Sequence, residues 1–188
     1  MLVKISRYFV VGAAVLIAIA SLYVRRETSQ ANKQVDEANA ASQAANALAE
    51  QVGPKYKDLF SETNIQGFPG NRDQYKATAQ ETVELLVKAA AQYRLAADKL
   101  EEASQQKVKK PLAEYWGLQV QSFRKLADSK EAFGNLVRLL LDESIQDTVA
   151  LNEKVSPLID RALALNEESD KFSAEAKKIQ DQHKDVFK

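Results

Sequence analysis

The chain has 188 residues and no cysteine, which excludes disulfides, thiol catalysis and zinc or iron–sulfur sites with cysteine ligands. Its formal charge is zero, but residues 1–26 hold four basic residues and no acid, so the remainder is mildly acidic. A protein that binds nucleic acid needs a basic face to neutralise phosphates, and we therefore expect no nucleic-acid partner.

The first element is an uncharged apolar run, Tyr8–Val24, in an otherwise hydrophilic chain. An apolar run with no polar face is typical of a segment that meets a lipid bilayer. As a helix its seventeen residues rise about 25 Å, and snorkelling of Arg7 and Arg25 covers the shortfall from a hydrocarbon core of roughly 30 Å. The run therefore predicts a single-pass transmembrane helix, with the lipid bilayer as its partner.

A cleavable signal peptide is the alternative interpretation of the same run. Lys4 and Arg7 form a charged start, and an A-x-A cleavage pattern ends at Ala20. Because the apolar run continues past that site, we favour an uncleaved signal anchor. The expected organisation is a membrane anchor or signal segment over 1–26 and an extracytoplasmic helical domain over 27–188, with secretion after cleavage as the alternative. Basic residues flank both sides of the run, which leaves the orientation open.

Glycine and proline are sparse in the rest of the chain, and apolar residues recur there with alternating spacings of four and three. This heptad spacing is typical of helices that pack side by side. We expect an all-α protein, an elongated antiparallel helical bundle or coiled-coil-like hairpin of three to four helices. The expected helices cover 27–51, 73–108, 111–155 and 157–185.

The segment 53–72, between the first two expected helices, is predicted to be a loop. It contains three aromatic residues, Tyr56, Phe60 and Phe68. If these side chains are exposed, they form a candidate interaction surface, because long loops often carry function. The alternative, which residue burial habits favour, is that the aromatics cap the end of the bundle.

Two positions decide where the later helices break. Lys107–Lys110 close the second expected helix with cations, and Pro111 is a natural first-turn residue for the third. The heptad spacing shifts by one residue near Ser144, which we interpret as a local change of supercoil inside a continuous helix. Ser156 and Pro157 resemble a helix N-cap followed by a first-turn proline, so we expect a turn or sharp kink there, with a kinked continuation of the same helix as the alternative.

No grouping of residues predicts catalysis, a metal site or a cofactor site. His183 is the only histidine, and it falls on an apolar stripe, where packing is its ordinary role. Acidic clusters alternate with lysines on helical stretches, which is typical of a solvated, ion-paired face. The chain has no P-loop, no dinucleotide-binding fingerprint and no EF-hand loop. We expect a protein that is not an enzyme.

The sequence favours a non-enzymatic, membrane-anchored helical scaffold or interaction protein of the cell envelope. Seam positions filled by poorly packing residues, such as Gln119 and Lys130, suggest that some heptad seams meet a protein partner or a second copy. The second hypothesis is a sensory or ligand-binding helical bundle. Its pocket would be lined by four aromatic residues, Tyr93, Tyr115, Trp116 and Phe123.

Overall fold

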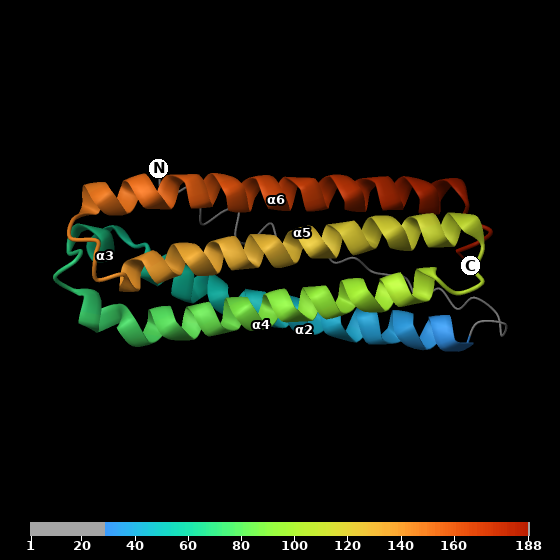
Figure 1. The fold of residues 1–188 in the computed structure, drawn as a ribbon, viewed down its shortest axis with the longest axis horizontal. Helices are drawn as coiled ribbons and strands as arrows, with labels where there is room; N and C mark the ends of the chain where they lie inside the picture. Colours follow the sequence, from blue (N-terminus) through green and yellow to red (C-terminus); the bar gives the residue numbers. More distant parts are fainter. Residues whose placement is uncertain (1–28, 188) are drawn as a thin grey trace.

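The computed structural model describes residues 29–187, which form an all-α bundle (Figure 1). Within this part of the chain the helices are α2 (Ser29–Leu59), α3 (Glu62–Gln66), α4 (Arg72–Ser104), α5 (Lys110–Leu141) and α6 (Thr148–Gln182). The predicted all-α helical bundle is therefore confirmed. The apolar run Tyr8–Val24 and its candidate cleavage site at Ala20 lie outside the described residues. Among the residues described, no helix combines the length and the apolar character that crossing a membrane requires.

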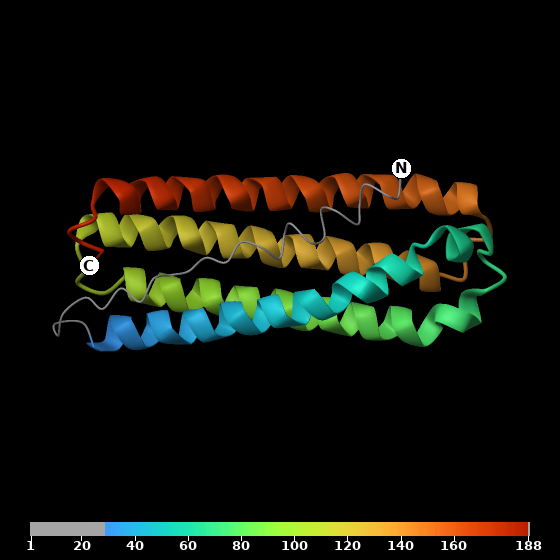
Figure 2. The ribbon, with the colours of Figure 1, turned by 180° about the vertical axis from the view of Figure 1, so that it is seen from behind.

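The four long helices lie antiparallel, each packed mainly on the helices that precede and follow it in the chain. In Figure 1, α6, α5 and α4 form successive rows and α2 lies behind α4; Figure 2 shows the same order from behind. The result is a rod, since α4 alone spans about 50 Å at ~1.5 Å per residue. The start of α2, the α4–α5 loop and the end of α6 share one end of the rod, and α3 lies at the other.

The core changes in character across the bundle. The buried side chains of α5 include large ones, such as Trp116, Phe123 and Phe133. The seam of α2 is built mainly from alanine, with Ala38 and Ala45 fully buried. Small side chains let α2 and α4 approach closely. Van der Waals contacts between the two backbones then make up for the smaller apolar area that alanine side chains bury.

The helix predicted to end at Gln51 continues through Gly53 and Pro54 to Leu59, so the predicted loop over 53–72 is wrong in its first part. A proline inside a helix costs roughly 3 kcal/mol. Continuing the helix buries Tyr56 and Leu59, each contributing about 1.5–3 kcal/mol, which offsets that cost. Pro54 itself is exposed. The rest of the predicted loop holds the short helix α3, which Ser61 caps by accepting from the Asn64 amide.

The predicted continuous helix over 111–155 is also wrong, because α5 ends at Leu141 and α6 begins at Thr148. Two aspartates direct the break. Asp142 accepts from the amide and hydroxyl of Ser144 at 2.9 and 2.6 Å, which closes a tight turn. Asp147 then caps α6 by accepting from the Val149 and Ala150 amides at 2.9 and 2.8 Å. The spacing shift near Ser144 therefore marks a turn.

Pro157 lies inside α6, so the turn or kink expected at this position is wrong as a helix boundary. Leu151, Val155 and Ala162 are buried on both sides of the proline, and they keep one face of α6 against the core. Burial of that face holds the helix together at Pro157, which has no backbone N–H to donate. The fourth predicted helix accordingly begins nine residues earlier than expected, at Thr148 rather than at Pro157.

Candidate functional site

The three aromatic residues predicted as a candidate interaction surface, Tyr56, Phe60 and Phe68, are all buried, with 3, 8 and 6% of their surface exposed. Tyr56 packs on Phe60 with ring centroids 4.6 Å apart and meets Phe133 edge-on at 5.7 Å. Burial raises the pKa of the Tyr56 phenol. These side chains cap the end of the bundle, so the exposed surface suggested by the sequence is corrected.

Arg72 completes this end of the rod. Its guanidinium lies 5.0 Å from the centre of the Phe68 ring. The same group donates to the carbonyl oxygens of Leu140, Asp142 and Ile145, at 3.1, 3.1 and 2.8 Å. The last carbonyls of a helix have no partner within the helix, and a charged donor is well suited to bind them. Arg72 thus ties α4 to the turn that follows α5.

The four aromatic residues considered as a pocket lining belong to the core, where each is 2% exposed or less: Tyr93, Tyr115, Trp116 and Phe123. Tyr93 and Phe123 lie in near-parallel planes with centroids 6.1 Å apart, and the Tyr93 hydroxyl donates to Asn46 Oδ1 at 2.6 Å. Burial raises the pKa of Tyr115 to about 12. These rings fill the space between the helices with their own packing.

The only histidine of the chain, His183, stands at the C-cap of α6, partly exposed. Its amide donates to the Ile179 carbonyl at 3.0 Å. Within residues 29–187 no three acidic or histidine side chains are grouped so as to hold a metal ion.

An ion-pair clamp that the sequence interpretation missed joins α4 to α5. Arg94 of α4 pairs with Asp128 at 3.2 Å and with Glu131 of α5. Arg124 of α5 pairs in return with Glu101 at 2.7 Å and Asp98 at 3.8 Å of α4. Each arginine therefore bridges an aspartate and a glutamate three residues apart on the other helix.

The clamp is built from one motif used twice. The motif reads aromatic–Arg–x–x–Ala–Asp–x–x–Glu and occurs over 93–101 and again over 123–131. Because α4 and α5 are antiparallel, the two copies face each other and each serves the other. The first residues of the copies are the stacked rings of Tyr93 and Phe123. This nine-residue motif, repeated at an interval of thirty residues, is the feature of the sequence that corresponds to the α4–α5 register.

The contact between α5 and α6 is polar at its centre. Ser122 Oγ lies 2.8 Å from the Ser169 hydroxyl and 2.9 Å from that of Ser173. Ser129 donates to the Ala162 carbonyl at 3.1 Å. Small hydroxyl side chains allow a close approach and satisfy one another, so this interface is specified by hydrogen bonds as well as by burial.

Lys130 and Gln119, the seam positions expected to meet a partner, are 3 and 2% exposed. Both are therefore enclosed by the bundle, which corrects the expectation that a partner reaches them. Desolvation lowers the pKa of Lys130 to about 8. A buried ammonium is costly in free energy, which is the physical cause of this shift.

Leu95 of α4 lies beside Ala40 and Ala41 of α2, and we call this surface the α2–α4 face. Val87 and Leu95 of α4 are 46 and 42% exposed, two of three exposed large apolar side chains among the residues described. Exposed Ala91 lies between them with the four-residue spacing that forms one row on a helix. On α2 the alanines at 40, 44 and 47 are also exposed, and Ala40 is the one of them that lines the hollow described next.

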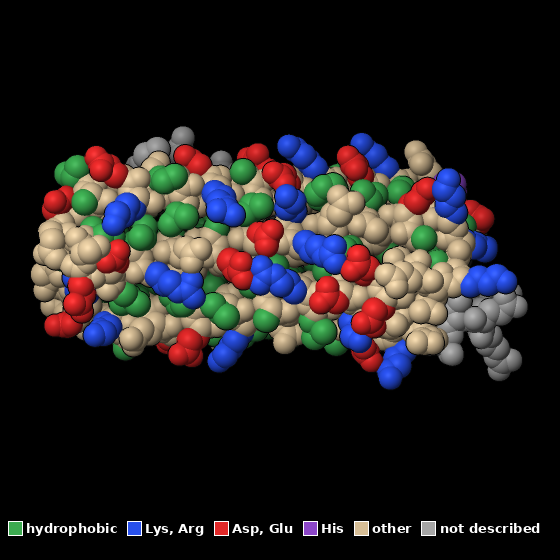
Figure 3. Space-filling view, viewed as in Figure 1, with side chains coloured by type: hydrophobic (Ala, Val, Ile, Leu, Met, Phe, Trp, Pro, Cys, Tyr) green, Lys and Arg blue, Asp and Glu red, His purple; other side chains and the backbone are tan. Residues whose placement is uncertain are grey.

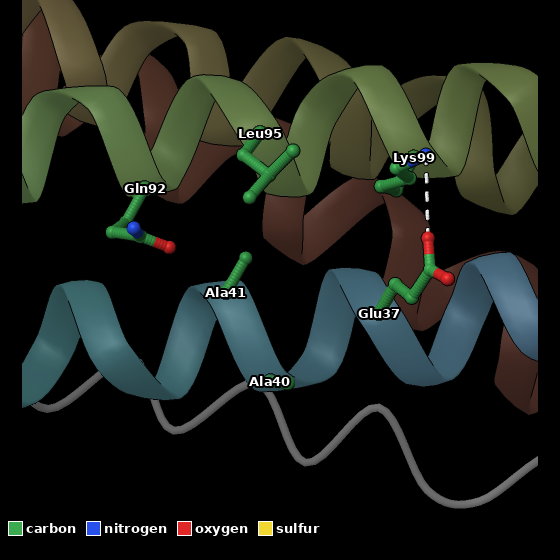
Figure 4. A pocket seen from close by; sticks show the side chains of 6 residues that line it. All are labelled: Glu37, Ala40, Ala41, Gln92, Leu95 and Lys99. Carbon is green, nitrogen blue, oxygen red and sulfur yellow. Dashed lines mark ion pairs between the residues drawn. The ribbon is translucent and has the colours of Figure 1, made fainter.

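A shallow hollow lies within the α2–α4 face, and Figure 4 shows it from close by. Leu95 and Gln92 of α4 point toward Ala41 of α2 across it. Its rim carries the ion pair between Lys99 Nζ and Glu37, at 3.2 Å. An apolar floor of small side chains with a charged rim is suited to receive another side chain or helix.

Comparisons of the chain with known protein families, with characterised proteins and with solved structures found no match.

Proposed function

We propose that this chain is a non-enzymatic, membrane-anchored helical scaffold or interaction protein of the cell envelope. In this proposal Tyr8–Val24 holds the chain at the bilayer, and the α2–α4 face receives another protein or a second copy. The observation that carries the proposal is the exposed row of Val87, Ala91 and Leu95 on α4, of which Leu95 lines the hollow with Ala40 and Ala41 of α2.

The rod gives this face a rigid support. The α4–α5 clamp holds α4 in a defined register, and α2 packs along the whole of α4. Ala40, the exposed alanine at the hollow, would let a partner helix approach the backbone of α2 closely. Val87 and Leu95 would then lie against that helix, so most of the binding free energy would come from their burial.

Membrane fractionation followed by intact-mass measurement tests the anchor. We expect the full chain in the membrane pellet after carbonate washing, with a mass that begins at Met1. A soluble product whose mass begins at Ser21 would contradict the anchor and support the alternative, secretion after cleavage at Ala20.

Cross-linking of the full chain in its native membrane tests the α2–α4 face. We expect a cross-linked complex with a protein or a second copy, and we expect the double variant Val87→Gln and Leu95→Gln to abolish it. Val149→Gln is the matched control, because Val149 is 67% exposed but lies at the start of α6. An unchanged complex in the double variant would refute this face as the binding surface.

The sensory hypothesis receives no support from the aromatic residues on which it depended. Tyr93, Tyr115, Trp116 and Phe123 pack against each other and their neighbours in the core. The proposed function therefore makes no use of a ligand pocket at these residues.

A further inference from the structure

One end of the rod is basic and has a fixed place relative to the start of α2. The loop between α4 and α5 lies at this end, beside Ser29, where α2 begins. The segment 103–113, which includes this loop, has three lysines and no acid, whereas the end of α6 at the same end of the rod adds Lys184 and the acids Asp181 and Asp185. Lys107, Lys109 and Lys110 are all exposed. In Figure 3 the right-hand end, which is this one, shows lysine and arginine side chains together with some acidic ones.

The opposite end of the rod is acidic. The segments 58–73 and 142–147 meet there and together carry six acids and one arginine. That arginine is Arg72, whose guanidinium is bound to backbone carbonyls. Figure 3 shows mainly acidic side chains at the left-hand tip. The loop segments at the two tips therefore differ in the sign of their charge, even though the chain as a whole is neutral.

The loop that carries the three lysines is held in place by packing. Val108 is partly buried against the core of the bundle, between two of the lysines. Phe187, near the other terminus of the described chain, packs edge-on against Tyr115 with centroids 5.2 Å apart. Lys109 is the N-cap of α5, and its carbonyl accepts from the Leu112 amide at 3.0 Å. The only ion pair found for these three lysines within the described residues joins Lys110 to Glu114 at 3.5 Å, and it is largely exposed.

We propose that the basic end of the rod rests on an anionic membrane surface, with Lys107, Lys109 and Lys110 contacting lipid phosphates. The inference rests on the proposed membrane anchor. Only four residues separate Val24 from Ser29, so an extended linker spans at most about 18 Å. That reach keeps the basic end near the lipid headgroups, where a surface potential acts on lysines within about a Debye length.

The difference in charge between the two tips also fixes which end faces the lipid. A rod lying flat would bring the acidic end to the same surface, and its six acids would be repelled. An end-on arrangement instead places the acidic end about 50 Å away, at ~1.5 Å per residue of α4. The α2–α4 face would then stand along the side of the rod, open to a partner.

The full chain in lipid nanodiscs provides the test. Because the chain has no cysteine, Gln105→Cys and Gln146→Cys each carry one spin label, at the basic and the acidic end. We measure relaxation of each label by a nickel-chelating lipid, in discs of phosphatidylcholine alone or mixed with phosphatidylglycerol. We expect strong relaxation at position 105 only, and a clear increase in the discs that contain phosphatidylglycerol.

Replacing the three lysines with glutamine should remove that increase. The matched control replaces three other exposed lysines, Lys57, Lys76 and Lys171, and should leave it unchanged. The same relaxation in both lipid mixtures, or no effect of the lysine substitutions, would overturn the contact, and an acidic protein partner for these lysines would follow as the better explanation. Failure of the chain to enter the discs would instead overturn the anchor, so the two failures are distinguishable.

Discussion

The guanidinium of Arg72, in the first turn of α4, donates to the carbonyl oxygen of Leu140, in the last turn of α5, across 3.1 Å. Two further carbonyls, of Asp142 and Ile145, complete the coordination of the same group. One charged side chain therefore replaces the partners that the end of α5 loses when the helix stops.

Replacing Arg72 with Met should destabilise the bundle by about 2 kcal/mol, because it leaves partly buried carbonyls without a charged donor. Chemical denaturation of the full chain in mild detergent measures the change. Arg161→Met is the control, since Arg161 is exposed in the middle of α6. Equal stability of the two variants would show that the carbonyls are satisfied without Arg72.

The clamp between Arg94 and Glu131 should contribute a coupling energy of about 0.5–1 kcal/mol in a double-mutant cycle with alanine, because both groups are nearly half exposed. The hydrogen bond from Arg94 lowers the pKa of the Glu131 carboxyl. The folded state therefore binds fewer protons than the unfolded state, and the contribution is present above about pH 4.3, the unfolded value, and is lost as the pH falls. Added salt should also weaken it, and a coupling energy insensitive to both salt and pH would refute the clamp.

Lys130 should make the bundle more stable at pH 10 than at pH 8. Burial lowers its pKa to about 8, so between that value and about 10.4 the unfolded chain binds more protons than the folded one, and stability rises with pH. Lys130→Met removes the buried charge and should raise stability at pH 7 by about 1–3 kcal/mol. Denaturation curves of wild type and variant across this pH range give the difference. A variant that retains the full pH dependence would assign that dependence to other groups.

Pro157→Ala should stabilise the protein by about 1–3 kcal/mol, because Pro157 stands inside α6, where it removes one helical hydrogen bond. Its side chain is exposed, so the alanine leaves no cavity. The midpoint of urea unfolding should rise without a change in its slope. A decrease in stability would indicate that the proline ring makes contacts that hold α6 to α5.

The sequence by itself determined the helical architecture. Heptad spacing and scarce glycine and proline predict long helices joined by short connections, because a continuous apolar stripe requires a neighbouring helix to cover it. The membrane segment over 1–26 stays a prediction of the same kind. The motif repeated at 93–101 and 123–131 was also present in the sequence, but only its antiparallel placement reveals that each copy pairs with the other.

Tertiary structure decided which helices run through a proline and which surface is free. Local signals at Pro54 and Pro157 predict breaks, yet burial of Tyr56, Leu59 and Val155 carries the helices through both prolines. The break after α5 also involves a long-range donor: Arg72 of α4, sixty-eight residues before Leu140 in the chain, donates to the Leu140 carbonyl. Exposure is also a property of the packed bundle, which buries Tyr56, Phe60 and Phe68 and leaves Val87 and Leu95 exposed. All five side chains are largely apolar, so the sequence does not show which of them the neighbouring helices will cover.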